Sequence, residues 1–290
     1  MLRPLAFHMY RPAGTATMPV MASRGMMRLV PVVIALLFVG YRYFAAETFT
    51  NAETGESHRV GLSREQESAL GLQGYREVLS SSPVVSSGPE LELVQRIVAR
   101  LAPATREQGF AWEASVVRED QANAFCLPGG KMVVYTGIIS IARDEAGLAT
   151  VMGHEMAHAT CRHGARRVFE QQNVQALMMG AAFSLSDLDY RKRAVVMGLL
   201  GAGAQYGLVL PFSRDHETEA DEVGLMYLAR AGYDPRAAVG FWQRMDEASS
   251  GRGQPPEFAS THPSHGTRIA HLERLMPKAV AEYEKVSRPR

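Results

Sequence analysis

Most of the chain carries apolar residues at the spacing of amphipathic helices. In residues 90–101 they recur every three or four positions, which predicts a helix that Pro103 ends. Ser63, followed by acidic residues and Gln66, has the features of a capped helix start, and we expect this helix to reach about Leu79. Similar patterns predict further helices over residues 144–164, from Ser213 onward, over 234–247 and over 266–283.

Three short segments have the composition of strands instead. Residues 112–117, 124–126 and 131–135 are rich in β-prone side chains, and a Pro-Gly-Gly turn separates the last two. We expect them to form a small antiparallel sheet beside the helix at 144–164, in a mostly helical α+β fold. The polar residues 51–63 are interpreted as a linker.

Two apolar stretches in the second half of the chain allow more than one interpretation. Residues 174–187 and 194–212 are strongly apolar, and the second is near the length of a membrane span. Buried core helices, a span and a hairpin that faces a membrane are all compatible with this pattern. Gly201, Gly203 and Gly207 weaken the case for a lone spanning helix.

The N-terminal region is basic and then apolar. Before Glu47 the charged side chains are arginines, and an apolar run extends from Leu29 to Tyr41. A cleaved secretory signal and an N-terminal anchor both fit, and the weak cleavage site at Ala45–Ala46 favours the anchor or an uncleaved signal. A mitochondrial transit peptide is a less favoured interpretation of the acid-free lead. The chain is therefore divided into a basic, disordered lead (1–28), a signal or anchor (29–46) and a folded domain (47–290).

The candidate chemistry is concentrated in residues 144–164, which contain the run His154-Glu155-Met156-Ala157-His158. Two histidines four residues apart on a helix project from one face, so both imidazoles can reach a single zinc ion. Glu155 can then act as general base toward a water on the metal. The alternative is a pair of buried histidines satisfied by hydrogen bonds.

A third ligand is available about sixty residues later. Glu217 and Asp221 are four residues apart and share a helix face, so Glu217 can complete a zinc site of two histidines and a glutamate, with water in the fourth position. Asp221 can accept a hydrogen bond from a ligand histidine. Glu219 and Glu222 fall off that face and are expected to be solvated, and His216 is expected to face elsewhere. An acidic, solvent-facing helix is the alternative.

These motifs resemble those of the gluzincin metalloproteases, in the family that includes the CaaX prenyl endopeptidase. The likeness is greatest to its bacterial periplasmic and mitochondrial inner-membrane, Oma-like quality-control branch. Residues 123–137 are similar to that branch's edge-strand segment, and Thr261-His262-Pro263-Ser264 with Arg268 is similar to its C-terminal motif. The resemblance covers roughly residues 50–275.

The resemblance implies one zinc ion per chain, bound by His154, His158 and Glu217, with Glu155 as the base. It also implies endopeptidase activity on misfolded or membrane-associated envelope polypeptides. Residues 47–290 would then be the metallopeptidase domain. The location it implies is the periplasmic side of a bacterial envelope, anchored in the inner membrane, with the mitochondrial inner membrane as the alternative.

Five further residues receive roles from the resemblance. Asn123, Ala124 and Phe125 lie in the edge-strand segment and would bind substrate, because a free strand edge can pair with an extended peptide. Arg268 and His262 are placed near the metal. Arg268 could stabilise the oxyanion of the tetrahedral intermediate. His262 could do the same, or it could be a removable fourth ligand that keeps the enzyme latent.

The remaining reactive side chains receive structural interpretations. Cys126 and Cys161 are expected to be two separate buried thiols, with a disulfide as the alternative. The histidines without a predicted role, His163, His265 and His271, are expected at the surface.

Two other classes of function fit the sequence. One is a chaperone-like protein that holds clients through the strand edge, with latent or secondary proteolysis. The other is a membrane-embedded structural component. The net charge of +1 gives no indication of nucleic-acid binding.

Overall fold

The computed structural model describes residues 21–204, 210–250, 256–262 and 266–287. Residues 1–20 of the predicted lead, residues 205–209 of the second apolar stretch, and Pro263, Ser264 and His265 lie outside the described residues. The elements, in chain order, are α1 (Met21–Ala45), β1 (Glu47–Thr50), β2 (Ser57–Val60), α2 (Arg64–Ser81), α3 (Pro89–Ala104), β3 (Glu113–Val117), β4 (Ala124–Leu127), β5 (Lys131–Tyr135), α4 (Thr136–Ala142), α5 (Glu145–Thr160), α6 (His163–Ser184), α7 (Tyr190–Ala204), α8 (Leu210–Arg230), α9 (Ala237–Ser249), α10 (Glu257–Thr261) and α11 (Gly266–Ser287). The mostly helical α+β fold is therefore confirmed.

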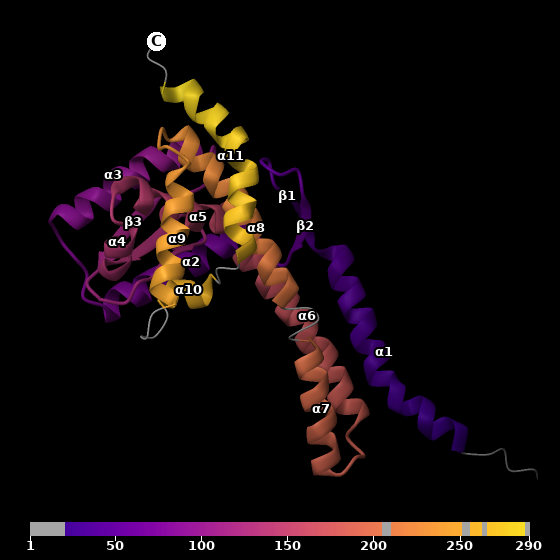
Figure 1. Cartoon of the computed structure of the whole chain (residues 1–290). Coiled ribbons are helices and arrows are strands. Elements are labelled where there is room, and N and C mark those ends of the chain that lie inside the picture. The colour runs from indigo at the N-terminus through magenta and orange to yellow at the C-terminus, as the bar shows by residue number, and fades with distance from the viewer. Residues whose placement is uncertain (1–20, 205–209, 251–255, 263–265, 288–290) are drawn as a thin grey trace, which may run out of the picture.

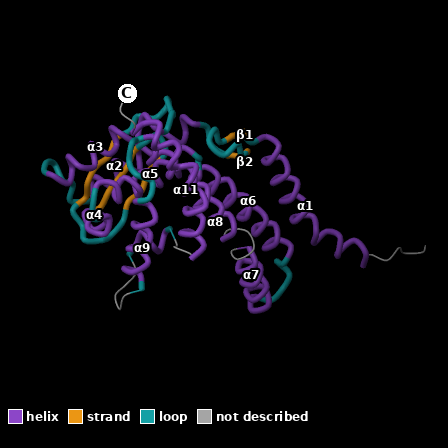
Figure 2. Tube along the Cα trace, turned by 45° about the horizontal axis from the view of Figure 1, so that its top comes forward, coloured by secondary structure: helices purple, strands orange, loops and turns teal. Residues whose placement is uncertain are grey.

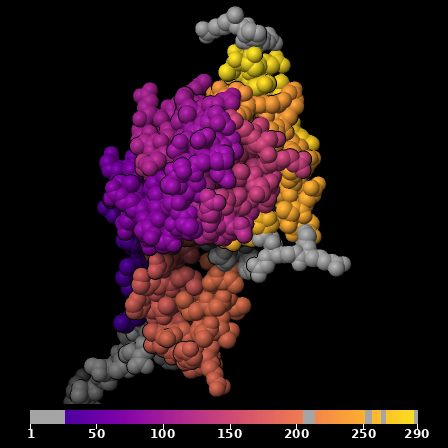
Figure 3. All heavy atoms as spheres, turned by 90° about the vertical axis from the view of Figure 1, so that its left-hand side faces the viewer, coloured from indigo at the N-terminus to yellow at the C-terminus, as the bar shows by residue number. Residues whose placement is uncertain are grey.

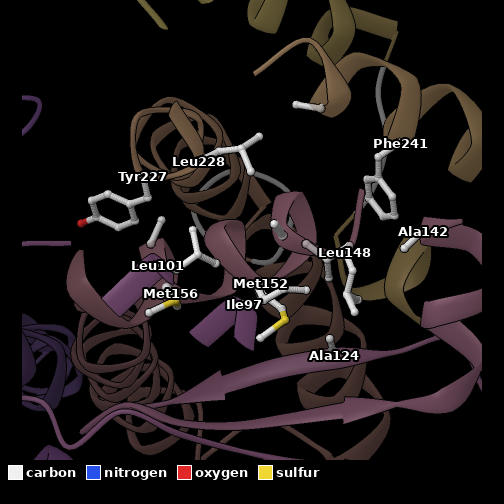
Figure 4. Packing of buried hydrophobic residues seen from close by; sticks show 14 of the residues in the cluster. Ile97, Leu101, Ala124, Ala142, Leu148, Met152, Met156, Tyr227, Leu228 and Phe241 are labelled. Atoms are coloured by element: carbon white, nitrogen blue, oxygen red, sulfur yellow. The ribbon is translucent and has the colours of Figure 1, made fainter. Parts of the chain in front are cut away.

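Helix α5 is the central element of the core. Asp144 caps it by accepting a hydrogen bond from the backbone N–H of Gly147 at 2.7 Å, as a side chain at this position of a helix commonly does. Leu148, Met152 and Met156 of α5 are fully buried. Figure 4 shows them packed among side chains of α3, β4, α8 and α9, which include Ile97, Ala124, Leu228 and Phe241. A helix buried on all sides in this way holds its side chains in fixed positions.

Helices α5 and α8 cross at very close range because glycines lie at the crossing. A Cβ atom at Gly224 of α8 would lie 3.0 Å from the Cα of His154 in α5, closer than an ordinary contact. On the facing side, a Cβ at Gly153 would lie 3.3 Å from the carbonyl oxygen of Gly224. The absence of side chains here brings the two helix backbones together, and it positions α8 directly over the ligand face of α5.

The larger sheet has the strand order β3-β5-β4 and lies among helices α2 to α5 (Figure 2). The prediction of an antiparallel sheet is right for β4 and β5 but wrong for β3, which pairs with β5 in parallel. The loop after β3 is held at the end of β5, where Glu119 accepts hydrogen bonds from Gly137 and Thr136. After β3 the chain therefore skips the central position, which β5 later fills, and forms β4 at the edge of the sheet.

Residues 51–63 do not form the predicted linker. β1 and β2 form an antiparallel hairpin, and Asn51 in its turn is buried. The turn is fixed to α8, because Glu53 forms a two-pronged ion pair with Arg230 at 2.5 and 2.7 Å. The short polar segment thus folds onto the domain through side-chain contacts, which its composition did not reveal.

The two apolar stretches form most of a helical hairpin, α6–α7, which projects from the rest of the fold beside α1 (Figures 1 and 3). None of the residues of α7 is buried, so the interpretation as buried core helices is wrong. Helix α1 begins at Met21, inside the segment predicted as lead. Its segment Met27–Ala45 is long enough and apolar enough to cross a membrane.

Candidate metal centre

Helices α5 and α8, with the segment after α10, bring four metal-binding side chains together. Nε2 of His154 lies 3.1 Å from Nε2 of His158 and 3.3 Å from Oε2 of Glu217. Nε2 of His158 lies 3.4 Å from Oε1 of Glu217. His262 joins them, with its Nδ1 3.0 Å from Glu217 and 3.4 Å from Nε2 of His154. One ligand atom from each of the four lies within 4.8 Å of the others.

This donor set fits a zinc ion. Ligand atoms at the usual zinc distance of about 2.1 Å in a tetrahedron are about 3.4 Å apart, which agrees with the separations among His154, His158 and Glu217. The outer nitrogen of each histidine also has a partner, because Nδ1 of His154 lies 3.1 Å from Asp221 and Nδ1 of His158 lies 2.9 Å from His163. With the Nδ1 protons used there, both Nε2 lone pairs point into the same space, and a cation between them removes their repulsion.

The charges around His154 favour a cation in the same place. Burial and the neighbouring Arg268 lower the pKa of His154, but hydrogen bonds to Asp221 and Glu217 outweigh them and raise it to about 9. Burial likewise raises the pKa of Glu217, yet hydrogen bonds from His154 and His262 hold it far below its ordinary value. The two carboxylates therefore attract positive charge, which a metal ion can supply in place of a proton.

Asp221 and Arg268 form a buried pair behind His154. Nη2 of Arg268 donates to Oδ1 of Asp221 at 2.7 Å, and Nη1 lies 3.4 Å from Glu217. The guanidinium also lies over the ring of Trp242, 3.5 Å from its centre. Asp221 thus contacts a histidine of the cluster, in the arrangement expected from its spacing, and Arg268 is brought to the site as the resemblance implied.

Glu155 lies beside the cluster and is nearly free of competing contacts. Its side chain is buried, and Oε1 has no hydrogen-bond partner among the described residues, although Nε2 of His262 lies 3.4 Å away. Burial raises its pKa, while the charges of His262 and His154 and the backbone N–H of Cys126 partly oppose this. A carboxylate with a raised pKa and a free oxygen is suited to take up and release a proton.

His163, expected at the surface, is instead buried behind His158. Its Nδ1 lies 2.9 Å from Nδ1 of His158, and its Nε2 lies 3.1 Å from Glu219. Burial lowers the pKa of His163 to about 4, so the ring is neutral near pH 7 and can hold the tautomer of His158.

Glu219 lies behind His163 and is buried, so the expectation that it is solvated is wrong. It accepts hydrogen bonds from Arg166 at 2.6 Å and from Asn51 at 2.7 Å. Burial raises its pKa, but the hydrogen bond from His163 and the neighbouring charges lower it to about 2. His216 is also buried and stacks on His163, with ring centres 4.3 Å apart, so it faces away from the metal cluster as expected. Glu222, in contrast, lies on the outside of α8 and pairs with Lys278.

The sequence could not indicate His163 because the helix breaks just before it. Arg162 adopts a left-handed conformation with φ of 57°, and the chain turns there from α5 into α6. The buried guanidinium of Arg162 stabilises this turn by donating to Glu67 at 2.9 Å and to the carbonyl of Leu62 at 2.6 Å. On a continued α5, His163 would project away from the position that it takes beside His158.

The free edge of β4 lies next to α5 and Glu155. The backbone N–H of Cys126 points to Glu155, so this edge of the strand faces the cluster. The side chain of Phe125 packs with Val133 and Tyr75 on the opposite face, and its main chain faces β5, because bonded pairs alternate along the antiparallel β4–β5 ladder. The side-chain oxygen of Asn123 accepts a hydrogen bond from the N–H of Ala124, and its backbone carbonyl accepts one from the N–H of Tyr135.

A cleft of about 180 Å³ opens onto the cluster. Its lining includes Cys126 and Pro128 of the β4–β5 hairpin, Glu155 and His158 of α5, and His262. Cys126 and Cys161 are both free thiols, as expected, but Cys126 is only half-buried, whereas Cys161 is 1% exposed and accepts a hydrogen bond from Asn51.

Comparison with known proteins identifies related sequences. The sequence pattern of peptidase family M48 matches residues 90–276. The mitochondrial metalloendopeptidase OMA1 of Schizosaccharomyces pombe is 37% identical over 226 residues, which cover 77% of this chain and 65% of that protein. OMA1 of Homo sapiens is 31% identical over 265 residues, 88% of this chain and 50% of its own length.

Bacterial proteins match as well. The beta-barrel assembly-enhancing protease of Yersinia pestis is 32% identical over 221 residues, 75% of this chain and 45% of that protein. The chain thus spans about half to two thirds of the length of these relatives.

Proposed function

The chain belongs to peptidase family M48, and from this premise we propose that it is a zinc-dependent endopeptidase. The observation that carries the proposal is the convergence of His154, His158 and Glu217, whose ligand atoms are separated by 3.1 to 3.4 Å. These residues would hold one zinc ion per chain. When bound, zinc would supply Lewis acidity and lower the pKa of a water molecule.

In the proposed mechanism, Glu155 is the general base and acid. Its unpartnered Oε1 would take the proton of the attacking water, and the carboxyl group would then donate it to the leaving amine. The raised pKa of Glu155 favours this second step. Asp221 and His163 would hold His154 and His158 with their Nε2 atoms directed into the site.

We propose that the edge of β4 binds the substrate main chain. A polypeptide added to this edge, at Asn123 to Phe125, would be extended and would lie between β4 and the cluster. Contacts would then be mainly to backbone groups, which suits a protease that accepts many sequences. Polypeptides in unfolded or misfolded regions meet this requirement, because their strands are unpaired.

His262 and Arg268 receive more specific proposals. Arg268 contacts Asp221 and Glu217, which supports a role in positioning both carboxylates, and its predicted contact with the oxyanion requires Nη1 to leave Glu217. His262 lies within reach of the other ligands, which supports its role as a removable fourth ligand. In that position it would block the access of water, and its release would activate the enzyme.

We further propose that α1 anchors residues 47–290, the metallopeptidase domain, at a membrane. The relatives named above are mitochondrial and bacterial, which supports both the periplasmic side of a bacterial inner membrane and the mitochondrial inner membrane. Misfolded or membrane-associated envelope proteins are the substrates that we propose for this location.

The experiment compares casein cleavage by the detergent-purified full chain, its Glu155→Gln variant and a Glu222→Gln control on the outside of α8. We expect cleavage by the wild type and the control, its loss in Glu155→Gln with zinc retained, and its loss on chelation. A chaperone-like client-binding protein would instead suppress client aggregation equally well with Gln at position 155. Equal cleavage by Glu155→Gln and the wild type would contradict the proposed mechanism.

A further inference from the structure

The α6–α7 hairpin presents an apolar surface that no other described part of the chain covers. Figure 3 shows it as a lobe that projects from the globular part of the molecule. Its exposed large apolar side chains include Met179, Phe183, Leu188, Val195, Leu199 and Leu200. Exposed apolar clusters of this kind mark surfaces that contact another protein or a lipid.

Helix α1 favours lipid over another protein as the surroundings of the hairpin, because this candidate membrane span runs antiparallel along α6 (Figure 1). Near the base of the hairpin, Arg42 donates to Gln172 at 2.6 Å. Near its tip, Arg28 pairs with Asp187 at 3.1 Å. Together, these two contacts place the second half of α6 alongside α1 from Arg42 to Arg28.

Between these two polar contacts the helices touch closely. A Cβ at Gly180 of α6 would lie 2.6 Å from the Cβ of Ala35 and 2.9 Å from the carbonyl oxygen of Pro31. Small residues that permit such close approach are typical of helix pairs in membranes. Gly180 therefore lies at the depth of residues 31–35, well inside the candidate span Met27–Ala45.

If α1 spans a bilayer, its position in the bilayer also determines how deeply the hairpin beside it lies. The 19 residues of its candidate span would extend about 28 Å as a helix, close to the hydrocarbon thickness of a bilayer. Only 6% of this segment is buried inside the protein, so its surroundings must supply the rest of its apolar contacts. Lipid around α1 would also surround the helices at its side.

The distribution of charged residues along the hairpin also fits a position in a bilayer. From residue 171 to residue 186 no side chain is charged, and none is charged from residue 194 to residue 204. Between residues 171 and 204 the charges are confined to the tip, where Asp187, Asp189, Arg191, Lys192 and Arg193 occur. An apolar middle with a charged tip beside Arg28 matches the profile of a bilayer, whose headgroups accept the charges.

We propose that the α6–α7 hairpin is embedded in the same bilayer as α1, with its charged tip at the far headgroup layer. Both ends of the hairpin return to the globular part, so the protein would contact lipid through three helices rather than one. α6 would then connect the bilayer directly to the candidate metal centre. From Gln172, level with Arg42, to His163 beside His158 is nine residues, about 14 Å along the helix. The centre would face polypeptides close to the membrane surface.

The test measures lipid contact and does not depend on activity. Three single variants of the full chain, Leu199→Cys on α7, Ile34→Cys on α1 and Leu70→Cys on α2, replace apolar side chains that are 70%, 60% and 55% exposed. Each is labelled with a fluorescent maleimide and reconstituted in phosphatidylcholine nanodiscs with or without nitroxide on the acyl chains. Labelled wild type gives the background from Cys126 and Cys161.

We expect the label at position 199 to be quenched by acyl-chain nitroxide as strongly as the label at 34, and the label at 70 to be unaffected. Val195→Cys, also exposed on α7, provides a second position if Leu199→Cys does not fold. Labels at 199 and 195 that behave like the label at 70 would overturn the proposal. If they resist both acyl-chain nitroxide and aqueous iodide, the hairpin is covered by protein, which overturns it equally.

Discussion

The substitution Gly224→Ala tests whether the close crossing of α5 and α8 builds the metal centre. The added Cβ would lie 3.0 Å from the backbone of His154, and ordinary contacts begin at 3.4 Å. The two helices must therefore separate by at least 0.4 Å, since backbone atoms cannot rotate away. That shift approaches the tolerance of about 0.5 Å within which functional groups must be held.

Two effects on stability oppose each other in this variant. Overpacking of a core costs about 1–3 kcal/mol, while alanine in place of glycine inside a helix contributes about 1 kcal/mol. We expect a net loss of up to about 2 kcal/mol, which lowers the melting temperature by up to about 8 °C. Restoring the ligand positions against the overpacking strain should weaken zinc binding by about 5–30-fold, because about 1–2 kcal/mol of that strain corresponds to such factors.

The assay combines thermal unfolding of the chelated full chain in detergent with zinc titration against a competing chelator. The matched control is Gly74→Ala in α2, where the nearest heavy atom to the new Cβ would be a leucine methyl at an ordinary 3.5 Å. This control should gain stability and bind zinc normally. If Gly224→Ala matches Gly74→Ala in both measurements, the glycine crossing does not position Glu217.

Other predictions concern the residues around the ligands and the β1–β2 turn. His163→Phe and Asp221→Asn should each weaken zinc affinity by about 10–100-fold, measured by chelator competition; unchanged affinity in both would exclude their positioning roles. Glu53→Gln should lower the free energy of unfolding by about 1.5–3 kcal/mol at pH 7, because it removes the charged partner of Arg230. The hydrogen bond from Arg230 holds the pKa of Glu53 below 4.5, so this difference should persist down to about that pH and disappear as the pH falls through the lowered pKa. A difference in unfolding free energy that is constant from pH 7 to pH 3 would refute the assignment.

Much of the candidate site could be predicted from local sequence patterns. His154, Glu155 and His158 could be predicted because a four-residue spacing on a helix determines a shared face, and Glu217 with Asp221 follows the same rule. The positions of these residues in the structure agree with that geometry. Their chemical roles remain predictions that the experiments above test.

The parts that the sequence did not reveal depend on contacts between distant segments. His163 reaches His158 only because Arg162 turns the chain, and Arg162 is held by Glu67 from another helix. Glu219 is buried among Asn51 of the β1–β2 hairpin and Arg166 and His163 of α6, which all bond to it. Neither relationship leaves a periodic signal in the chain.

The apolar hairpin shows a different kind of limit. Hydrophobicity predicted that residues 174–187 and 194–212 avoid water, but it did not specify what covers them. The position of α6 beside α1, through Gly180 and Ala35, favours lipid over the protein core as the surroundings of the hairpin. Parallel pairing of β3 with β5 was likewise hidden, because strand composition does not encode strand order.

The proposed metal centre is tested most simply by the zinc content of the purified full chain, measured by mass spectrometry beside Glu217→Ala. We expect about one zinc ion per wild-type chain and markedly less in the variant, because the substitution removes a ligand together with the carboxylate that holds His262 at 3.0 Å. The Glu222→Gln control should keep its metal, since that carboxylate pairs with Lys278 on the outside of α8. A wild-type chain that holds no zinc after refolding with the metal, or a Glu217→Ala chain that holds as much as the wild type, would contradict a zinc site formed by His154, His158 and Glu217.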